Sequence, residues 1–207
     1  QGFAYSCRKL GVKGVIFMPI ITPKQKVTQT RMFGEDSIQI TLTGDTFDDC
    51  AVAAREYTEA HEMTFIPPFD DLRIIEGQGT VAVEILEDQP EIDYLFVPVG
   101  GGGLASGVGA YFKTYSPATK IIGVEPEGSP TLAACLQAGR KVRLDAVTSR
   151  VATMSCRETD ERIFRIVQQG VDEVVLVSDD EMLQASRWLW SEFGIAADLS
   201  GAASIAA

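Results

Sequence analysis

The feature that most constrains the fold is that apolar residues come mainly in short continuous runs, bounded by glycine, proline or polar residues. The runs lie at residues 14–20, 37–42, 94–99, 120–126 and 172–177. A strand that is apolar on successive positions is buried on both faces, and segments with helical spacing separate most of these runs. We therefore expect an α/β fold, in which helices cover both faces of a parallel twisted sheet.

Helical spacing and helix-end signals place helices between the expected strands. The segments are 46–60, 77–88, 104–115, 129–139 and 178–193. Thr46 is a candidate N-cap, Ser178 and Glu181 fit a capping box, and Gly194 is suited to end the last helix. The turn-rich stretch FIPPFDD at 65–71 is a candidate boundary between subdomains. Both ends of the chain read as interrupted helices, so we expect a fragment of a longer protein.

Composition excludes several classes of function. The formal net charge of −11 disfavours binding to nucleic acid or to anionic membranes, both of which need basic patches. No run approaches the roughly 20 apolar residues that span a bilayer, and no signal-peptide layout is present, so we expect a cytoplasmic protein. Four scattered cysteines and a single histidine, His61, offer neither zinc spacing nor a multi-histidine metal site. The chemistry of this chain must therefore proceed without histidine or with a cofactor.

Four consecutive glycines follow an expected strand in YLFVPVGGGGLASG at 94–107. Glycine costs conformational entropy and adds no side chain to a core, and one or two would suffice for a tight turn. A strand, a glycine loop and a helix N-terminus together suit a phosphate, because backbone N–H groups and the helix dipole favour an anion. We therefore interpret the glycines as a phosphate-binding loop.

A nicotinamide dinucleotide is one candidate ligand for this loop. Gly100, Gly102 and Ala105 fit the pattern GxGxxA, and Glu125 stands at the end of the next strand, where an acid that binds ribose is expected. That motif belongs after the first strand of a dinucleotide-binding fold, whereas two expected strands precede the glycines here.

The wider order of motifs resembles a known family. FIPPFDDLRIIEGQGTVAVEIL, DYLFVPVGGGGLASGVG and KIIGVEPEGSPTL follow one another, and DEVVLVSDDEM and DLSGAASIAA continue the series. This order resembles the pyridoxal-phosphate enzymes of the threonine/serine dehydratase family, which share the tryptophan-synthase-β (type II) fold. The resemblance covers nearly the whole chain. It implies that residues 1–62 are part of a small α/β domain, and that residues 63–207 form a large cofactor-phosphate-binding domain whose C-terminal part is missing.

The resemblance implies a set of cofactor-binding residues. Backbone groups of the loop would hold the phosphate of pyridoxal 5'-phosphate. Asp198 replaces the family's glutamate close to the cofactor ring, and Thr153 and Met154 stand where members commonly have Asp-Gly. The loop residues are Gly100, Gly101, Gly102, Gly103 and Leu104. The family's Schiff-base lysine would lie upstream of Gln1, so we expect no catalytic residue within this chain.

A divalent cation is a further implication of the resemblance. In some members, a residue that matches Glu125 binds the cation together with a carbonyl, here that of Ser129. The family's third ligand is an aspartate, and this sequence has Thr131 in its place. One carboxylate and a carbonyl are a poor ligand set for a hard cation, and a solvated carboxylate at a strand end is the alternative.

The implied function is a pyridoxal-phosphate lyase that deaminates L-threonine or L-serine to a 2-oxo acid and ammonia. A serine racemase-like activity in the same site, an NAD-dependent oxidoreductase and a non-catalytic fragment that binds a phosphate ligand remain as alternatives. The expected partner is a small amino-acid substrate, and the resemblance suggests a homo-oligomer. RWLW at 187–190 is a candidate interface, although tryptophans at helical spacing are more often part of a core.

Overall fold

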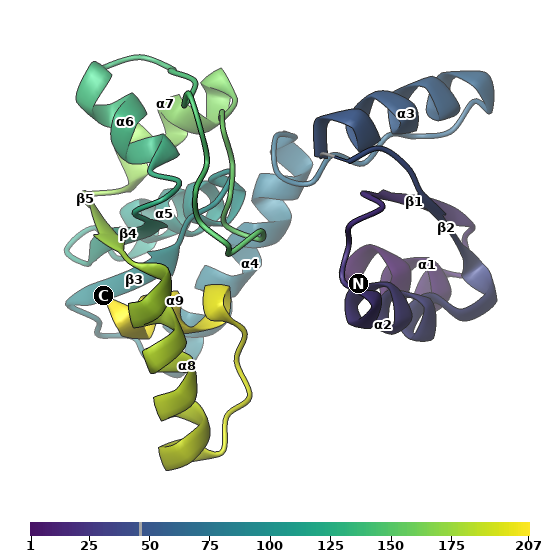
Figure 1. The fold of residues 1–207 in the computed structure, drawn as a ribbon. Helices are drawn as coiled ribbons and strands as arrows, with labels where there is room; N and C mark the ends of the chain where they lie inside the picture. The colour runs from purple at the N-terminus through teal and green to yellow at the C-terminus, as the bar shows by residue number, and fades with distance from the viewer. Residues whose placement is uncertain (46) are drawn as a thin grey trace. The chain divides into compact units, whose positions relative to one another are not determined.

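The computed structural model describes residues 1–45 and 47–207, and the chain divides into two compact units, Gln1–Ile66 and Pro67–Ala207 (Figure 1). The division falls within the turn-rich stretch at 65–71. The assignment of residues 1–62 and 63–207 to a small and a large domain stays a prediction. Thr46, the candidate cap, lies outside the described residues. Parallel strands alternate with helices in both units, so the α/β fold class is confirmed.

The first unit is a two-stranded parallel sheet with three α-helices. Its elements are α1 (Gly2–Leu10), β1 (Gly14–Met18), α2 (Lys24–Gly34), the 3-10 helix η1 (Glu35–Ser37), β2 (Ile38–Leu42) and α3 (Phe47–Ala60). Strand β1 pairs with β2 from Gly14 opposite Ile38 to Met18 opposite Leu42. The sequence analysis missed α2 because most residues of KQKVTQTRMFG are polar, so no apolar stripe at helical spacing marks the helix.

The second unit carries a three-stranded parallel sheet in the order β3-β4-β5. Its elements are α4 (Leu72–Asp88), β3 (Tyr94–Pro98), α5 (Gly103–Tyr115), β4 (Lys120–Pro126), α6 (Thr131–Ala138), α7 (Glu161–Gly170), β5 (Glu173–Val177), α8 (Asp179–Phe193) and α9 (Leu199–Ala206). The capping box of Ser178 with Glu181 is confirmed, and Gly194 ends α8 with φ 65°.

Helices cover both faces of this sheet. Neighbouring residues of a strand point to opposite faces, and the two core clusters follow this alternation. Ile121 of β4 packs into the cluster that includes Val108 and Phe112 of α5, whereas Val124 packs with Met182 of α8 and Ala203 of α9. The glycine loop joins β3 to α5, so it lies at the carboxyl end of the sheet, where ligands of open α/β folds bind.

Two helices of the second unit differ from the sequence expectation. Helix α4 begins at Leu72 rather than at 77, because the Asp71 side chain caps it by accepting the Arg73 N–H at 2.8 Å. Gly77 and Gly79, which suggested that the helix begins at 77, lie inside α4. Helix α7 was not expected, although Asp160 caps it and Ile163 is buried on its inner face.

The tryptophans of the candidate interface RWLW are exposed, although tryptophans at helical spacing are more often part of a core. Trp188 and Trp190 of α8 are 49% and 64% exposed, and Phe193 contacts Trp188 edge-on with ring centroids 5.0 Å apart. Among the described residues, no helix is long and apolar enough to cross a membrane.

Candidate functional site

The glycine loop is held between the end of β3 and the first turn of α5. The Val99 N–H donates to the Val124 carbonyl at 2.8 Å, which extends the pairing with β4 up to the first glycine. Gly102 is the N-cap residue of α5 and has φ 92°, a left-handed conformation that favours glycine. The loop therefore presents its backbone at the positive end of the α5 dipole.

Close packing accounts for much of the glycine content. A Cβ atom on Gly101 would lie 2.6 Å from the ring of Phe69, and one on Gly102 would lie 2.6 Å from Ile163 Cγ2. A Cβ on Gly103 would lie 2.9 Å from Phe69 Cβ. Side chains are thus excluded by the protein itself, so the number of glycines alone does not demonstrate a ligand.

The hydrogen bonding of the loop is stronger evidence for a ligand than the number of its glycines. The carbonyl oxygens of Gly101 and Gly102 accept from Thr159 Oγ1 and from the Ser106 N–H, each at 2.9 Å. Within the described part of the chain, the N–H groups of Gly100, Gly101 and Gly102 have no acceptor. Gly102 is buried, and buried N–H groups are nearly always paired. An anion with several oxygen atoms, such as a phosphate, fits this arrangement of donors.

Ser106, on the first turns of α5, adds a second unsatisfied group. It is fully buried, and its Oγ has no hydrogen-bond partner among the described residues. The sequence analysis did not single out Ser106, because a serine inside an expected helix belongs to no binding motif. Only its position, four residues after Gly102, relates it to the loop.

The structure connects Asp198 to the loop through two hydroxyl groups. Asp198 caps α9, where its Oδ1 accepts the Gly201 N–H and the Ser200 hydroxyl, both at 2.8 Å. Ser200 Oγ in turn accepts from Thr153 Oγ1 at 2.9 Å. The backbone at Thr153 approaches Gly100, where an added Cβ would lie 3.0 Å from the Thr153 carbonyl oxygen. These segments therefore lie on the same side of the loop.

Met154 follows Thr153 and has a buried side chain. Its side chain is 3% exposed and packs in a core cluster with Val124, Val151 and Val177. The methionine therefore fills the core beneath the Thr153 turn, and its place beside a cofactor ring stays a prediction.

Glu125 is fully buried at the end of β4, so it is not the solvated carboxylate considered as an alternative. Its Oε1 accepts the Leu132 N–H and its Oε2 accepts the Ala133 N–H, both at 2.8 Å. Burial raises the pKa of Glu125 to about 7, and the backbone hydrogen bonds from α6 partly oppose this shift. Both oxygens face α6 and Glu125 is fully buried, so the carboxylate presents no exposed surface to a ribose.

The expected cation site does not have the donor set of a metal centre. The Thr131 and Ser129 hydroxyls both donate to the Cys156 carbonyl oxygen, and the Glu125 carboxylate faces N–H dipoles whose positive ends repel a cation. In the described ranges 1–45 and 47–207, no group of three or more histidine, cysteine, aspartate or glutamate residues can hold a metal ion.

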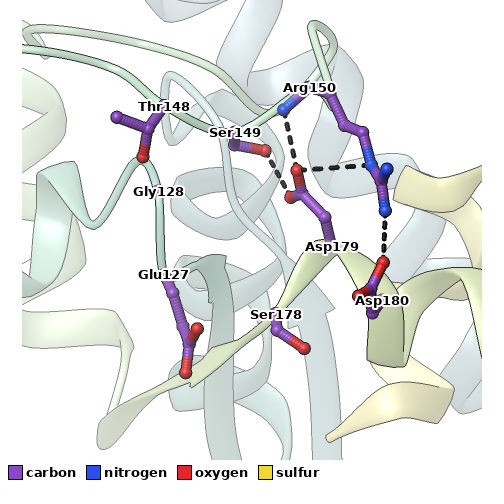
Figure 2. A pocket seen from close by; sticks show the side chains of 8 residues that line it. All are labelled: Glu127, Gly128, Thr148, Ser149, Arg150, Ser178, Asp179 and Asp180. Atoms are coloured by element: carbon purple, nitrogen blue, oxygen red, sulfur yellow. Dashed lines mark hydrogen bonds and ion pairs between the residues drawn. The ribbon is translucent and has the colours of Figure 1, made fainter.

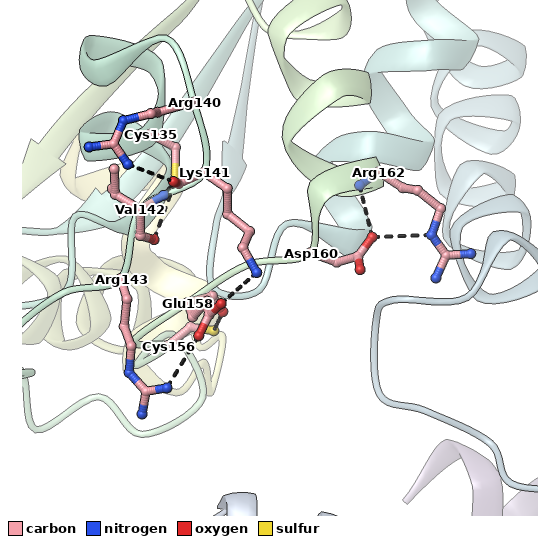
Figure 3. A network of polar contacts seen from close by, with 9 residues as sticks. All are labelled: Cys135, Arg140, Lys141, Val142, Arg143, Cys156, Glu158, Asp160 and Arg162. Atoms are coloured by element: carbon pink, nitrogen blue, oxygen red, sulfur yellow. Dashed lines mark hydrogen bonds and ion pairs between the residues drawn. The ribbon is translucent and has the colours of Figure 1, made fainter.

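A long connection between α6 and α7, residues 140–159, brings Thr153 and Thr159 to the loop. Figure 3 shows Glu158 between two cations, with Oε1 2.5 Å from Lys141 Nζ and Oε2 3.3 Å from Arg143 Nη1. The Leu144 N–H also donates to the Arg157 carbonyl at 2.8 Å. These contacts join the two halves of the connection, which sequence periodicity did not resolve.

The tip of this connection closes a polar pocket of about 490 Å³ at the ends of β4 and β5. In Figure 2, Arg150 lies beside Asp179 and Asp180; Asp179 also accepts the Ser149 hydroxyl at 2.6 Å. Most of its charged groups are therefore paired with each other. The sequence analysis missed this pocket because its residues come from three separate segments. They are Glu127, Gly128, Thr148, Ser149, Arg150, Ser178, Asp179 and Asp180.

A parallel α/β unit with a glycine loop and a helix N-terminus at the carboxyl end of its sheet is an arrangement typical of proteins that bind a phosphate-bearing cofactor. The family model of pyridoxal-phosphate dependent enzymes matches residues 1–207, and the chain belongs to this family. The suspected resemblance is thereby confirmed.

Three relatives illustrate the similarity. The chain is 45% identical, over 100% of its length and 50% of the relative's, to a biosynthetic L-threonine dehydratase IlvA of Halalkalibacterium halodurans. It matches the processed form of threonine deaminase isoform 2 from Solanum lycopersicum with a TM-score of 0.92 and 37% identity, covering 100% of this chain and 59% of that one. It matches maize serine racemase with a TM-score of 0.92 and 28% identity, covering 98% and 60% of the two chains. The chain therefore spans about half the length of the curated relatives that it matches.

Proposed function

We propose that the protein carrying this chain is a pyridoxal-phosphate lyase that deaminates L-threonine, L-serine or both to a 2-oxo acid and ammonia. The observation that carries the proposal is the set of N–H groups at Gly100, Gly101 and Gly102 without acceptors in the described chain, at the N-terminus of α5. The names of the H. halodurans and tomato relatives support the reaction and the choice of substrate.

Within this proposal, the residues of this chain bind and orient the cofactor. The backbone of Gly100–Leu104 holds the phosphate, and the Thr153–Ser200–Asp198 hydrogen bonds fix one side of the site. Pyridoxal phosphate, when bound, supplies a conjugated ring that accepts the electrons released at the substrate α-carbon. The lysine that carries the cofactor is expected upstream of Gln1, so this chain contributes positioning and electrostatics rather than a nucleophile.

A serine racemase-like activity is the second candidate. The match to maize serine racemase has the same TM-score, 0.92, as the match to the tomato threonine deaminase, although its sequence identity is lower. The products separate the two reactions: a lyase releases ammonia and a 2-oxo acid, whereas a racemase produces D-serine from L-serine. The nicotinamide alternative is not retained, because Glu125 is committed to α6 and the chain belongs to a pyridoxal-phosphate family. The cytoplasmic location and the homo-oligomer stay predictions.

The test uses the full-length protein and two glycine variants. We expect wild type to bind pyridoxal phosphate and to release ammonia from L-threonine or L-serine. Gly100→Ala, which brings a Cβ 3.0 Å from the Thr153 carbonyl oxygen, should weaken pyridoxal phosphate binding on the order of tenfold by displacing N–H donors. Gly77→Ala is the matched control, because nothing lies within 4 Å of its Cβ position. Wild type that binds the cofactor but forms only D-serine would support the racemase, and no binding would overturn both.

A further inference from the structure

The carboxylate of Glu125 holds the N-terminus of α6 with both of its oxygens. It accepts the N–H groups of Leu132 and Ala133, the second and third residues of the helix, at 2.8 Å each. These groups have no partner within a helix, so a buried helix start needs an acceptor from elsewhere. Pro130, the N-cap residue, offers no side-chain hydrogen bond. Glu125, seven residues before Leu132, supplies the missing cap from the end of the neighbouring strand.

Leu132 connects this anchor to the glycine loop. Its side chain is fully buried, and its Cδ1 lies 3.0 Å from the position of a Cβ on Gly102. Ile163 of α7 lies against the same position at 2.6 Å, so the two side chains together support the backbone of Gly102. Because Gly102 carries one of the N–H groups without an acceptor, its position decides where those donors point.

We propose that Glu125 is a positioning residue, which anchors α6 so that Leu132 supports Gly102 and shapes the phosphate-binding loop without a divalent cation. The inference rests on the proposed function, because it concerns the same loop. The carbonyl oxygen of Ser129, the second expected ligand, accepts the Thr131 N–H at 3.0 Å, and the Thr131 hydroxyl, at the place of the third ligand, donates to the Cys156 carbonyl. The helix N–H groups direct their positive ends at both Glu125 oxygens, which disfavours a cation beside them. Glu125 therefore positions the phosphate-binding loop through its hydrogen bonds to α6, without a cation.

The test compares the affinity of the full-length protein for pyridoxal phosphate with its affinity for pyridoxal, which lacks the phosphate, at pH 8. We expect Glu125→Gln, in which an amide group replaces one acceptor, to weaken pyridoxal phosphate binding about tenfold. The affinity for pyridoxal should not change. Ser178→Ala removes the cap of α8, a helix that does not support the loop, and should change neither affinity. Magnesium chloride or a chelator should not alter the wild-type affinities.

Two further measurements keep the proposal testable if Glu125→Gln folds poorly. Leu132→Val removes the Cδ1 atom that supports Gly102 and should reduce the preference for pyridoxal phosphate in the same way. Hydrogen exchange of the protein without cofactor should be faster at the Leu132 and Ala133 amides in Glu125→Gln, and unchanged there in Ser178→Ala.

The outcomes separate this inference from the proposed function. Wild type that binds pyridoxal phosphate no better than pyridoxal would overturn phosphate binding by the loop, and both proposals with it. Wild type that prefers pyridoxal phosphate, with the same preference in Glu125→Gln and Leu132→Val, would overturn only the positioning role. A cation that tightens cofactor binding in wild type but not in Glu125→Gln would make Glu125 a metal ligand and would also overturn it.

Discussion

At the scale of single residues, Glu125 makes a pH prediction with a definite sign. Burial raises its pKa from 4.5 to about 7, so the folded protein binds a proton there more tightly than the unfolded chain does. The stabilising contribution of that proton is fully present below pH 4.5 and is lost as pH rises through about 7. Relative to Glu125→Gln, the free energy of unfolding of wild type should therefore fall by about 3 kcal/mol between pH 4.5 and 8.

Urea unfolding of both proteins across this pH range measures the difference, and the other titrating groups cancel in the comparison. Parallel pH profiles of wild type and Glu125→Gln would contradict the prediction. A confirmed decline would mean that the carboxylate reduces stability at neutral pH, as residues retained for function commonly do.

Sequence reasoning placed Glu125 at a strand end but did not indicate the contacts that its side chain makes. Glu125 was expected at the end of a strand, but its contact with α6 depends on how the turn after Pro126 folds back. The burial of the Met154 side chain in a core cluster was likewise not indicated by the sequence. A sequence pattern indicates which face of a strand is buried, whereas the direction of a side chain in an irregular connection depends on packing from distant segments.

At the scale of elements, the approach of α5 to α4 depends on glycine. A Cβ on Gly107 would meet the Ile75 carbonyl oxygen and would lie 2.6 Å from the Gly79 N atom. Backbone atoms cannot move aside as a side chain does, so Gly107→Ala should reduce the free energy of unfolding by about 3 kcal/mol. Gly77→Ala, also in a helix but with open space, should raise it by up to about 1 kcal/mol. Equal effects in urea unfolding would exclude close packing as the cause.

The connection between α6 and α7 allows a second prediction at this scale. Glu158→Gln removes the ion pairs with Lys141 and Arg143, which are partly exposed. The global free energy of unfolding should therefore change by less than about 1 kcal/mol. Local opening should increase instead, seen as faster hydrogen exchange and proteolysis within 140–159. Glu161→Gln is the control, because its pair with Arg165 lies within one helix; the same local effect there would contradict the interpretation.

Helix α8, with a clear apolar stripe and end signals, was predictable, whereas α7 was missed although it has both. Helix α2 is mostly polar, and the start of α4 was hidden because Gly77 and Gly79 suggested a boundary. Gly79 is instead needed for contact with α5, where its Cβ would lie 3.3 Å from the Gly107 carbonyl oxygen. Tertiary contact thus overrode the local helix propensity of these residues.

At the scale of the whole molecule, the α/β class followed from the alternation of apolar runs with helices, because that pattern samples the entire chain. The place of the glycine loop at the carboxyl end of the sheet follows from its position after an expected strand, whereas the order β3-β4-β5 was not predicted. The polar pocket of Figure 2 could not be anticipated, since it forms where three segments far apart in sequence meet. A candidate site at a single strand-to-helix junction can therefore be recognised from the sequence, because its residues are consecutive. A site formed by several connections cannot.

Binding at the loop should also be visible in the stability of the full-length protein. A ligand that binds only the folded state raises the free energy of unfolding by about 2.7 kcal/mol when its concentration is 100 times its Kd. Removing pyridoxal phosphate should therefore lower the unfolding temperature. If the N–H groups of Gly100–Gly102 hold the phosphate rather than the ring, as proposed, inorganic phosphate should restore part of the loss, and chloride of equal ionic strength should not. In Gly100→Ala the restoring effect of phosphate should be smaller than in Gly77→Ala. Equal restoration by chloride would mean that the ions act by general screening and that the loop does not select phosphate.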